Sequence, residues 1–227
     1  MPVSHPRTVR SFVRREGRMT NAQQRAFTTL WPVYGIDTTE ETLRPELIFG
    51  RVAPLTLEIG FGNGKSLAEM ALAAPERNFI GIEVHRPGAG NLLQALSREN
   101  ITNVRILCTD AVDVLENCIS AATIDKVQIF FPDPWHKKRH HKRRLIQPDF
   151  VKLLGTRLKQ GGQLHIATDW PDYASHIIEV MQNTAEFIDT SSSGGCQARP
   201  EYRPITKFEL RGKRLGNPVC DLIYQRQ

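Results

Sequence analysis

The stretch LTLEIGFGNG, residues 55–64, joins a short apolar run to a glycine-rich turn. Such a run, ending in glycine, predicts a buried strand. The next residues, 65–74, have helical composition and stop at Pro75, and a second apolar run, FIGIEV, follows at 79–84. A buried strand, a helix and another buried strand predict two parallel strands joined by a right-handed crossover.

The same alternation continues towards the C-terminus. Further strands are predicted at 104–108, 126–131 and 163–168, and further helices at 87–100, 111–120, 149–159 and 173–182. The helix at 149–159 is expected to end at the glycine pair 161–162. Two closing strands are predicted at 186–190 and 219–226, separated by a long insert in which Thr206-x-x-Glu209 has capping-box spacing. We therefore expect an α/β fold with a mostly parallel, seven-stranded sheet and helices on both faces.

The first part of the chain differs from the rest. Residues 1–53 lack a clear strand pattern and carry turn signals at Trp31-Pro32 and Tyr34-Gly35. We expect a basic N-terminal extension over 1–53, irregular or helical, and one α/β domain over 54–227. The serine- and glycine-rich segment at 191–195 is expected to be a mobile loop.

Charge is concentrated in two places in this chain of 227 residues and net charge +6. Residues 1–25 hold six arginines and a single acid, and residues 136–144, HKKRHHKRR, hold six lysines and arginines and no acid. Because these clusters together exceed the charge of the whole chain, the remainder is acidic. An acidic body with two basic clusters indicates a polyanion bound at a defined place.

Composition excludes several classes of protein. No apolar run approaches the roughly 18 residues of a membrane span. The N-terminus has no apolar core of a secretory signal. The four cysteines form no CxxC pair, so neither a cysteine-based zinc site nor a disulfide scaffold is expected, and a reducing cytoplasm is the expected location.

A carboxylate lies at the end of each of the five predicted parallel strands: Glu58, Glu83, Asp110, Asp133 and Asp169. Ligands of open α/β sheets bind beyond these strand ends. Any one of these acids could instead cap the helix that follows it. That alternative does not explain Glu58, which lies inside the apolar run. A carboxylate buried there needs a partner, and a ligand is the natural one.

The glycine turn at 60–64 spells GxGxG, which is neither a Walker A loop nor the GxGxxG of dinucleotide sites. Glu83 lies 19 residues after Gly64, the distance at which an acid meets a ribose diol. A nucleoside without a pyrophosphate fits S-adenosylmethionine, because a rim of carboxylates attracts its sulfonium and ammonium groups. We expect its adenine near Asp110 and its methionyl part near Glu58 and the glycines.

The segment FPDPW, residues 131–135, holds Asp133 between two prolines, which is typical of a preorganised reacting centre. A plain proline-rich turn with a packing tryptophan is the alternative. The basic run follows Trp135 directly, at the same edge of the sheet, where it would surround the mouth of the site with cations. A solvated charged loop is the alternative there, but the position favours an enzyme that acts on RNA or DNA.

The segments EIGFGNG, GIEVHRPG, FPDPWHKKRHHKRR, ATDW and ITKFE, in this order, resemble the bacterial tRNA (guanine-N7-)-methyltransferases. RREGRMTNAQQRA and LWPVYGI resemble the extension of that family, so the resemblance covers residues 10–225. It implies a Rossmann-like class I S-adenosylmethionine-dependent methyltransferase fold, with 54–227 as the methyltransferase domain. The implied activity is methylation of N7 of the variable-loop guanosine at position 46 in tRNA numbering, which gives 7-methylguanosine. S-adenosylmethionine is the implied donor, and no metal is expected.

The resemblance also implies roles for particular residues. Asp133 would be catalytic. The donor would be bound by Glu58, Gly60, Gly62, Gly64, Glu83, Asp110 and Asp133. The substrate would be bound by Lys137, Asp169, Thr206, Lys207, Phe208 and Glu209. RNA would contact Arg139, His140, His141, Lys142, Arg143 and Arg144.

The chemistry implied is simple, because guanine N7 has a lone pair and no proton, so no general base is needed. Asp133 could stabilise the positive charge that develops on the base, or hold the base by accepting from its N–H groups. Trp135 or Trp170 could stack on the base. The expected partner is tRNA, with no DNA and no membrane, and the protein would be a monomer or a homodimer.

Two other functions are compatible with the same fold. A small-molecule methyltransferase would act on a free metabolite without sensitivity to salt. A non-catalytic RNA-binding protein on a methyltransferase fold would fail to bind S-adenosylmethionine.

Overall fold

The computed structural model describes residues 11–12, 17–37, 42–192, 194–206, 209–210, 216 and 218–227. Its strands form one seven-stranded sheet in the order β3-β2-β1-β4-β5-β7-β6, in which β7 pairs antiparallel with both β5 and β6. The strands are β1 Leu55–Ile59, β2 Asn78–Ile82, β3 Val104–Leu107, β4 Ile124–Phe130, β5 Leu158–Thr168, β6 Phe187–Asp189 and β7 Cys220–Arg226. The predicted α/β class and the mostly parallel sheet are confirmed.

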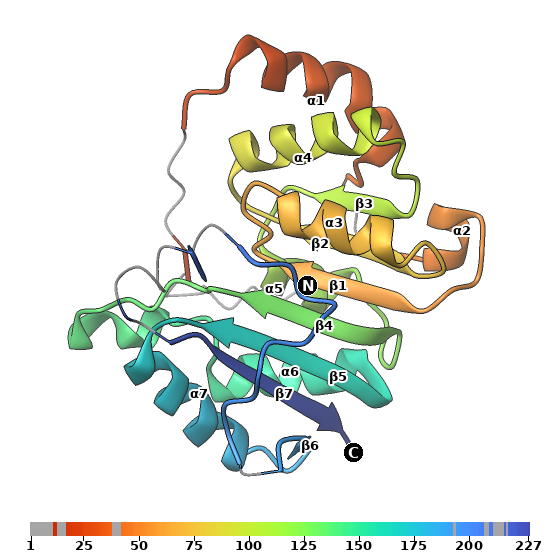
Figure 1. Ribbon diagram of the computed structural model, residues 1–227. Helices are drawn as coiled ribbons and strands as arrows, with labels where there is room; N and C mark the ends of the chain where they lie inside the picture. The colour runs from red at the N-terminus through yellow and green to blue at the C-terminus, as the bar shows by residue number, and fades with distance from the viewer. Residues whose placement is uncertain are drawn as a thin grey trace, which may run out of the picture.

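Helices cover both faces of this sheet (Figure 1). They are α1 Asn21–Tyr34, α2 Pro45–Phe49, α3 Lys65–Ala73, α4 Arg86–Arg98, α5 Ala111–Asn117, η1 Lys138–Arg143, α6 Pro148–Arg157 and α7 Pro171–Gln182. On one face α3 and α4 pack in a core that includes Phe79 and Phe130, and α1 packs on α4. On the other face α5, α6 and α7 pack against alternate residues of the same strands, such as Leu57 and Val127.

The fifth strand begins earlier than its sequence indicates. The glycine pair 161–162 was expected to end the preceding helix, but it lies inside β5, which starts at Leu158 and pairs there with Ile124. The register between β4 and β5 shifts after Ile124, and Gly161 has φ +77°, a conformation that favours glycine. These glycines therefore serve a bulged strand rather than a helix end.

The expected turn at Trp31-Pro32 is also wrong, because both residues lie in the last part of α1. Thr20 and Gln23 start that helix with a reciprocal capping box. The Gln23 amide then donates to the Pro87 carbonyl at 3.1 Å and to the Asn91 side chain at 3.0 Å, which fixes α1 on α4.

The division of the chain at 53/54 stays a prediction, and four of the six N-terminal arginines (7, 10, 14 and 15) lie outside the described residues.

The sequence predicts no disulfide scaffold, but the described structure holds a disulfide. Cys196 and Cys220 are joined, with Cα atoms 4.9 Å apart. They meet because the segment after Cys196 runs antiparallel to the start of β7, where Gln197 bridges Asp221. The CxxC spacing test missed this pair because the two cysteines are 24 residues apart.

In the described part of the chain, no helix is long and apolar enough to cross a membrane.

Candidate active site

Two adjoining cavities open at the C-terminal ends of the parallel strands. The first, of about 560 Å³, is lined by Glu58, the glycine turn, Thr206 and Leu210. The second, of about 620 Å³, is lined by acids that follow β2, β3 and β4, namely Glu83, Asp110 and Asp133. Gly60, His85, Phe130 and Phe131 line both cavities, so four of the five predicted carboxylates surround one continuous region.

The glycine turn has backbone conformations that residues other than glycine rarely adopt. Gly60, Gly62 and Gly64 have φ of +78°, +60° and +77°. A Cβ on Gly64 would in addition lie 2.5 Å from Cβ of Leu92 in α4. The turn therefore keeps its backbone at the wall of the first cavity and its helix close to α4.

Glu83 holds this turn in place. Its Oε2 accepts from the N–H of Gly62 at 2.8 Å, and its Oε1 accepts from the N–H groups of Val84 and His85 at 2.8 and 2.9 Å. The same carboxylate lines the second cavity. It has a structural function in the strand-end loops and is also placed to accept from a ligand hydroxyl.

Glu58 is buried with an unsatisfied oxygen. It is 2% exposed, and its Oε2 has no hydrogen-bond partner among the described residues. Burial, with a smaller effect from the charge of Glu83, raises the pKa of Glu58 to about 8. A buried carboxyl without a partner is costly, so a cationic ligand group in the first cavity would complete it.

Asp110 caps a helix and lines the cavity at once. Its Oδ1 accepts from the N–H of Val112 at 3.0 Å at the start of α5. The helix-cap alternative weighed from the sequence is therefore correct for this residue, and it does not exclude a contact with a ligand.

The loop that carries Asp133 is conformationally strained. Phe131 and Trp135 have φ of +54° and +48°, which is unfavourable for bulky side chains. The N–H of Phe131 donates to the carbonyl of Ala167 at 2.7 Å, and the N–H of Trp135 donates to Oδ1 of Asp133 at 3.3 Å. The loop thus leaves the Asp133 side chain exposed on the rim of the second cavity.

Residues 52–222 match the model of a family described as "Putative methyltransferase". The chain is 54% identical to a tRNA (guanine-N(7)-)-methyltransferase of Aeromonas hydrophila, over 97% of this chain and 93% of that one. It is 52% identical to an enzyme of the same name from Marinobacter nauticus, over 99% and 94%. The chain belongs to the tRNA (guanine-N(7)-)-methyltransferase family.

Solved structures of methyltransferases share its fold. One is a 16S rRNA (adenine(1408)-N(1))-methyltransferase from Catenulisporales acidiphilia with its cosubstrate S-adenosylmethionine, at 15% identity and a TM-score of 0.54, covering 81% of this chain and 92% of that one. Another is the aminoglycoside resistance methyltransferase NpmB1, at 13% identity and a TM-score of 0.55, covering 82% and 95%. The Rossmann-like class I methyltransferase fold expected from the sequence is therefore confirmed.

The basic run of this methyltransferase forms the short 3-10 helix η1, preceded by Lys137. The side chains of Lys137, Arg139 and Lys142 are exposed, and those of His140, His141 and Arg143 are partly buried. The guanidinium of Arg143 lies 4.4 Å from the centre of the Trp135 ring, and the His140 ring meets the same ring edge-on at 5.9 Å. The helix is thus fixed beside the Asp133 loop.

Arg144 differs from the rest of the basic run. The resemblance implies an RNA contact for it, but its side chain is directed inward. It is 3% exposed, its Nε donates to the Pro134 carbonyl at 3.0 Å, and its Nη2 pairs with the carboxylate of Asp172 in α7. The guanidinium also lies 4.9 Å from the Tyr173 ring centre. Because these contacts bury it, Arg144 supports the loop from inside and offers almost no exposed surface.

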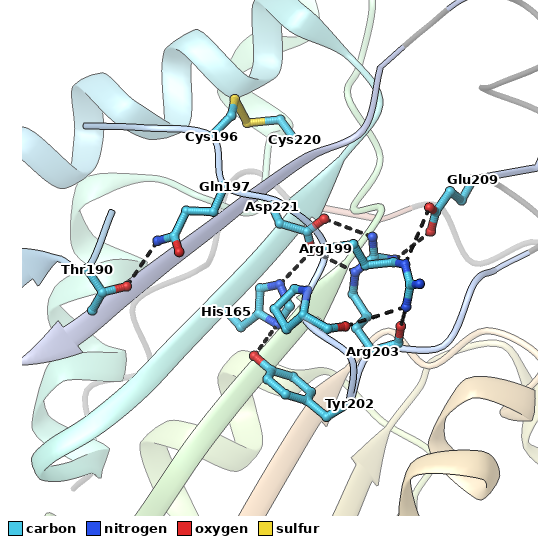
Figure 2. A network of polar contacts seen from close by, with 11 residues as sticks. His165, Thr190, Cys196, Gln197, Arg199, Tyr202, Arg203, Glu209, Cys220 and Asp221 are labelled. Carbon is cyan, nitrogen blue, oxygen red and sulfur yellow. Dashed lines mark hydrogen bonds and ion pairs between the residues drawn. A yellow bond between two sulfur atoms is a disulfide. The ribbon is translucent and has the colours of Figure 1, made fainter. Parts of the chain in front are cut away.

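Glu209 is likewise directed inward. It is 2% exposed, and its Oε2 accepts from Nη1 of Arg203 at 2.8 Å (Figure 2). Its N–H donates to the hydroxyl of Thr206 at 3.1 Å, one of the two bonds of the predicted capping box.

Thr206 lines the first cavity, whereas Lys207 and Phe208 lie outside the described residues. Asp169 is partly buried and, in the described structure, lines neither cavity.

Arg203, the partner of Glu209, belongs to a buried polar network that the sequence does not predict. Arg203 donates from Nε and Nη2 to the two carboxylate oxygens of Asp221, at 2.6 and 2.8 Å. Asp221 also accepts from Nε2 of His165 at 2.7 Å, and Nδ1 of His165 accepts from the Tyr202 hydroxyl at 2.9 Å (Figure 2). Burial lowers the pKa of His165, which keeps the ring neutral in this tautomer. No local motif in the sequence indicates these contacts, because Arg203 and Asp221 are 18 residues apart.

Proposed function

We propose that the protein transfers a methyl group from S-adenosylmethionine to N7 of the variable-loop guanosine of tRNA and produces 7-methylguanosine. The observation that carries the proposal is the placement of Asp133, exposed on the rim of a carboxylate-lined cavity and followed at once by the basic helix η1. This combines a site for a cationic nucleoside donor with a surface for a polyanion. The family membership supports the same substrate.

The residues present fit the donor. The unsatisfied Oε2 of Glu58 would accept from its ammonium group in the first cavity, and the Glu83 carboxylate would accept from its ribose hydroxyls in the second. Asp110 lies at the end of β3, where the adenine would be held. When bound, S-adenosylmethionine supplies a methyl group that is activated by its positively charged sulfur.

Asp133 would act on the guanine base. N7 attacks through its lone pair and carries no proton, so the protein need not supply a base. The base gains positive charge as the methyl group arrives, and a fixed carboxylate stabilises that charge or accepts from the N–H groups of the base to hold it in line. The two proline residues and the strained loop keep this carboxylate in place without reorganisation.

The tRNA would dock on η1 and Lys137, with phosphates against the exposed side chains of Lys138, Arg139 and Lys142. The guanosine must leave its contacts within the tRNA, which costs a few kcal/mol. The Trp135 ring already contacts Arg143 and His140, and the Trp170 ring contacts His136 at 4.2 Å. Because the substrate is tRNA, we place the enzyme in the cytoplasm.

Incubation with unmodified tRNA and methyl-labelled S-adenosylmethionine, followed by nucleoside analysis, tests the proposal. Label is expected in 7-methylguanosine, and a tRNA whose variable-loop guanosine is replaced by adenosine should receive none. Labelling of another nucleoside or position would refute the assignment. Donor binding without methylation of tRNA would favour a small-molecule methyltransferase, and no donor binding would favour a non-catalytic RNA-binding protein.

A further inference from the structure

A third cavity, of about 630 Å³, lies on the same face of the sheet as the first but at the opposite ends of the strands. Its lining comes from the start of β1, from β4, from the early part of β5 and from the segment after α3, with Tyr202 at one side. The volume is within the usual range for small-molecule sites. None of the acids assigned to the donor lines it.

Two cations line this cavity without a carboxylate partner among the described residues, namely Arg77 and Lys126. Nε of Arg77 donates to the Thr56 hydroxyl at 3.2 Å, and Nζ of Lys126 lies 3.2 Å from the centre of the Tyr202 ring. Burial, and then the like charge of Arg77, lowers the pKa of Lys126 to about 7. Two neighbouring cations that lack a counter-ion among the described residues are unfavourable, and a bound anion would remove that cost.

The acids nearby do not supply this counter-ion. Asp125 lines the cavity, but its carboxylate accepts from Nζ of Lys159 at 2.9 Å and from the N–H of Leu55 at 2.7 Å. Glu76 is exposed at the margin. Lys159 therefore has a carboxylate partner, whereas Arg77 and Lys126 have none among the described residues.

Gln128 adds an independent observation. It is 1% exposed, lines the cavity, and its Oε1 is buried without a hydrogen-bond partner in the part of the chain that the structure describes. A buried amide oxygen in this state needs a donor. A phosphate group has oxygens for two cations, and a hydroxyl or amino group on the organic part of such a ligand can donate to the amide oxygen. Met70 and Phe79 provide apolar surface beside these polar groups.

We infer that the third cavity binds a small organic phosphate, with the phosphate group held by Arg77 and Lys126, a hydroxyl or amino group of the organic part donating to Oε1 of Gln128, and its apolar part against Met70 and Phe79. This site is separate from the donor and tRNA sites. Its occupancy can be measured without methyltransferase activity.

The test uses the reactivity of Lys126 in the full-length protein. Acetic anhydride acetylates the neutral amine, so lysine-resolved mass spectrometry at pH 8 and constant ionic strength reports the ionisation of each lysine. Inorganic phosphate should slow acetylation of Lys126 about tenfold in a saturable manner, because a bound anion raises its pKa towards the ordinary value. The exposed Lys65 should be unaffected. Phenyl phosphate should protect at lower concentrations than inorganic phosphate.

Two matched variants separate a site from general electrostatics. Arg77→Gln and Lys159→Gln each remove one cation from the lining. The first should abolish saturable protection of Lys126, and the second should preserve it. Equal protection in both variants, parallel slowing of Lys65 and Lys126, or no protection in the wild type would overturn the inference. Phenyl phosphate no better than inorganic phosphate would overturn the role of the apolar wall.

Discussion

The N–H of Gly62 donates to Oε2 of Glu83 at 2.8 Å, so the acid at the end of β2 fixes the glycine turn at the end of β1. The two loops face one another because β1 and β2 are adjacent and parallel. A single side chain therefore controls both the shape of the turn and one wall of the second cavity. Donor binding and local stability should change together when it is replaced.

Glu83→Ala should weaken donor binding by about 1.5–3 kcal/mol, the usual contribution of hydrogen bonds to a charged acceptor. It should also lower the melting temperature, because three backbone N–H groups lose their acceptor. Calorimetry with S-adenosylmethionine and without tRNA measures the first effect. A lowered melting temperature with an unchanged dissociation constant would show that Glu83 only shapes the loops.

Glu58 should make donor binding depend on pH. Its pKa of about 8 keeps the free carboxyl protonated at neutral pH, whereas an ammonium partner favours the ionised form. Donor affinity of the wild type, relative to Glu58→Gln, should therefore rise as pH increases from 6 to 8. Comparison with the variant removes titrations of the donor itself. A constant ratio over this range would exclude Glu58 from ammonium binding.

Without bound donor, Glu58 should make the stability of the protein fall as pH rises, which is opposite to its effect on donor affinity. Burial raises the folded pKa of Glu58 above its unfolded value of 4.5, so the folded state binds more protons than the unfolded state. The stability that it contributes is fully present below pH 4.5 and is lost as pH rises to about 8. Urea unfolding of the wild type and Glu58→Gln across this window measures the difference, which should decrease with pH.

The parts of the site that follow from the sequence are those set by local pattern. An acid inside the apolar run of 55–59 had to be buried, and GxGxG had to be a tight turn, so Glu58 and the glycines could be placed without coordinates. The position of the site also follows, because parallel strands that alternate with helices bring their C-terminal ends to one edge.

The remaining features depend on side-chain pairs that no local motif indicates. The basic run does not indicate that Arg144 turns inward, because Asp172, which pairs with it, is 28 residues away. Nor does the ITKFE segment indicate that Glu209 faces Arg203 rather than solvent. In both places the sequence predicts a contact with RNA or substrate, whereas the side chain is buried against a counter-charge, which is the exposed Asp172 for Arg144 and the buried Arg203 for Glu209.

Arg203→Met should be strongly destabilising. It leaves the carboxylates of Asp221 and Glu209 buried without their guanidinium, and breaking a buried pair in this way costs about 3–5 kcal/mol. Arg199→Met is the matched control, because Arg199 is exposed and lies 4.0 Å from Glu209. Urea unfolding of both variants measures the difference. Similar free energies of unfolding would mean that the buried network contributes little to stability.

Asp133→Ala should reduce the single-turnover rate by roughly two to three orders of magnitude if its charge stabilises the transition state. Donor affinity should fall much less, since the side chain lies on the rim of the cavity. Asp133→Asn separates the two proposed roles. It keeps a carbonyl that can accept from the base but removes the negative charge, so substantial activity in this variant would favour positioning. Wild-type rates in Asp133→Ala would remove the residue from the mechanism.

The basic helix should determine how tRNA binding responds to salt. Lys138, Arg139 and Lys142 are exposed on η1, whereas Arg144 is retained because it supports the loop from inside. Replacing the three exposed residues with glutamine should weaken tRNA binding and leave donor binding unchanged. Each lost phosphate contact removes about 0.7–0.9 from the slope of log K against log salt, so the slope should fall by about two to three.

A control for total charge replaces Arg98, Lys152 and Lys159, which are exposed on other elements, with glutamine. This variant loses the same net charge, so its salt slope should stay near that of the wild type if contacts rather than overall charge determine binding. The measurement is tRNA affinity at several salt concentrations for the three proteins. Equal slopes in the two triple variants would mean that η1 is a solvated charged segment. The phosphate contacts would then have to be sought among the N-terminal arginines, of which Arg18 and Arg25 are described.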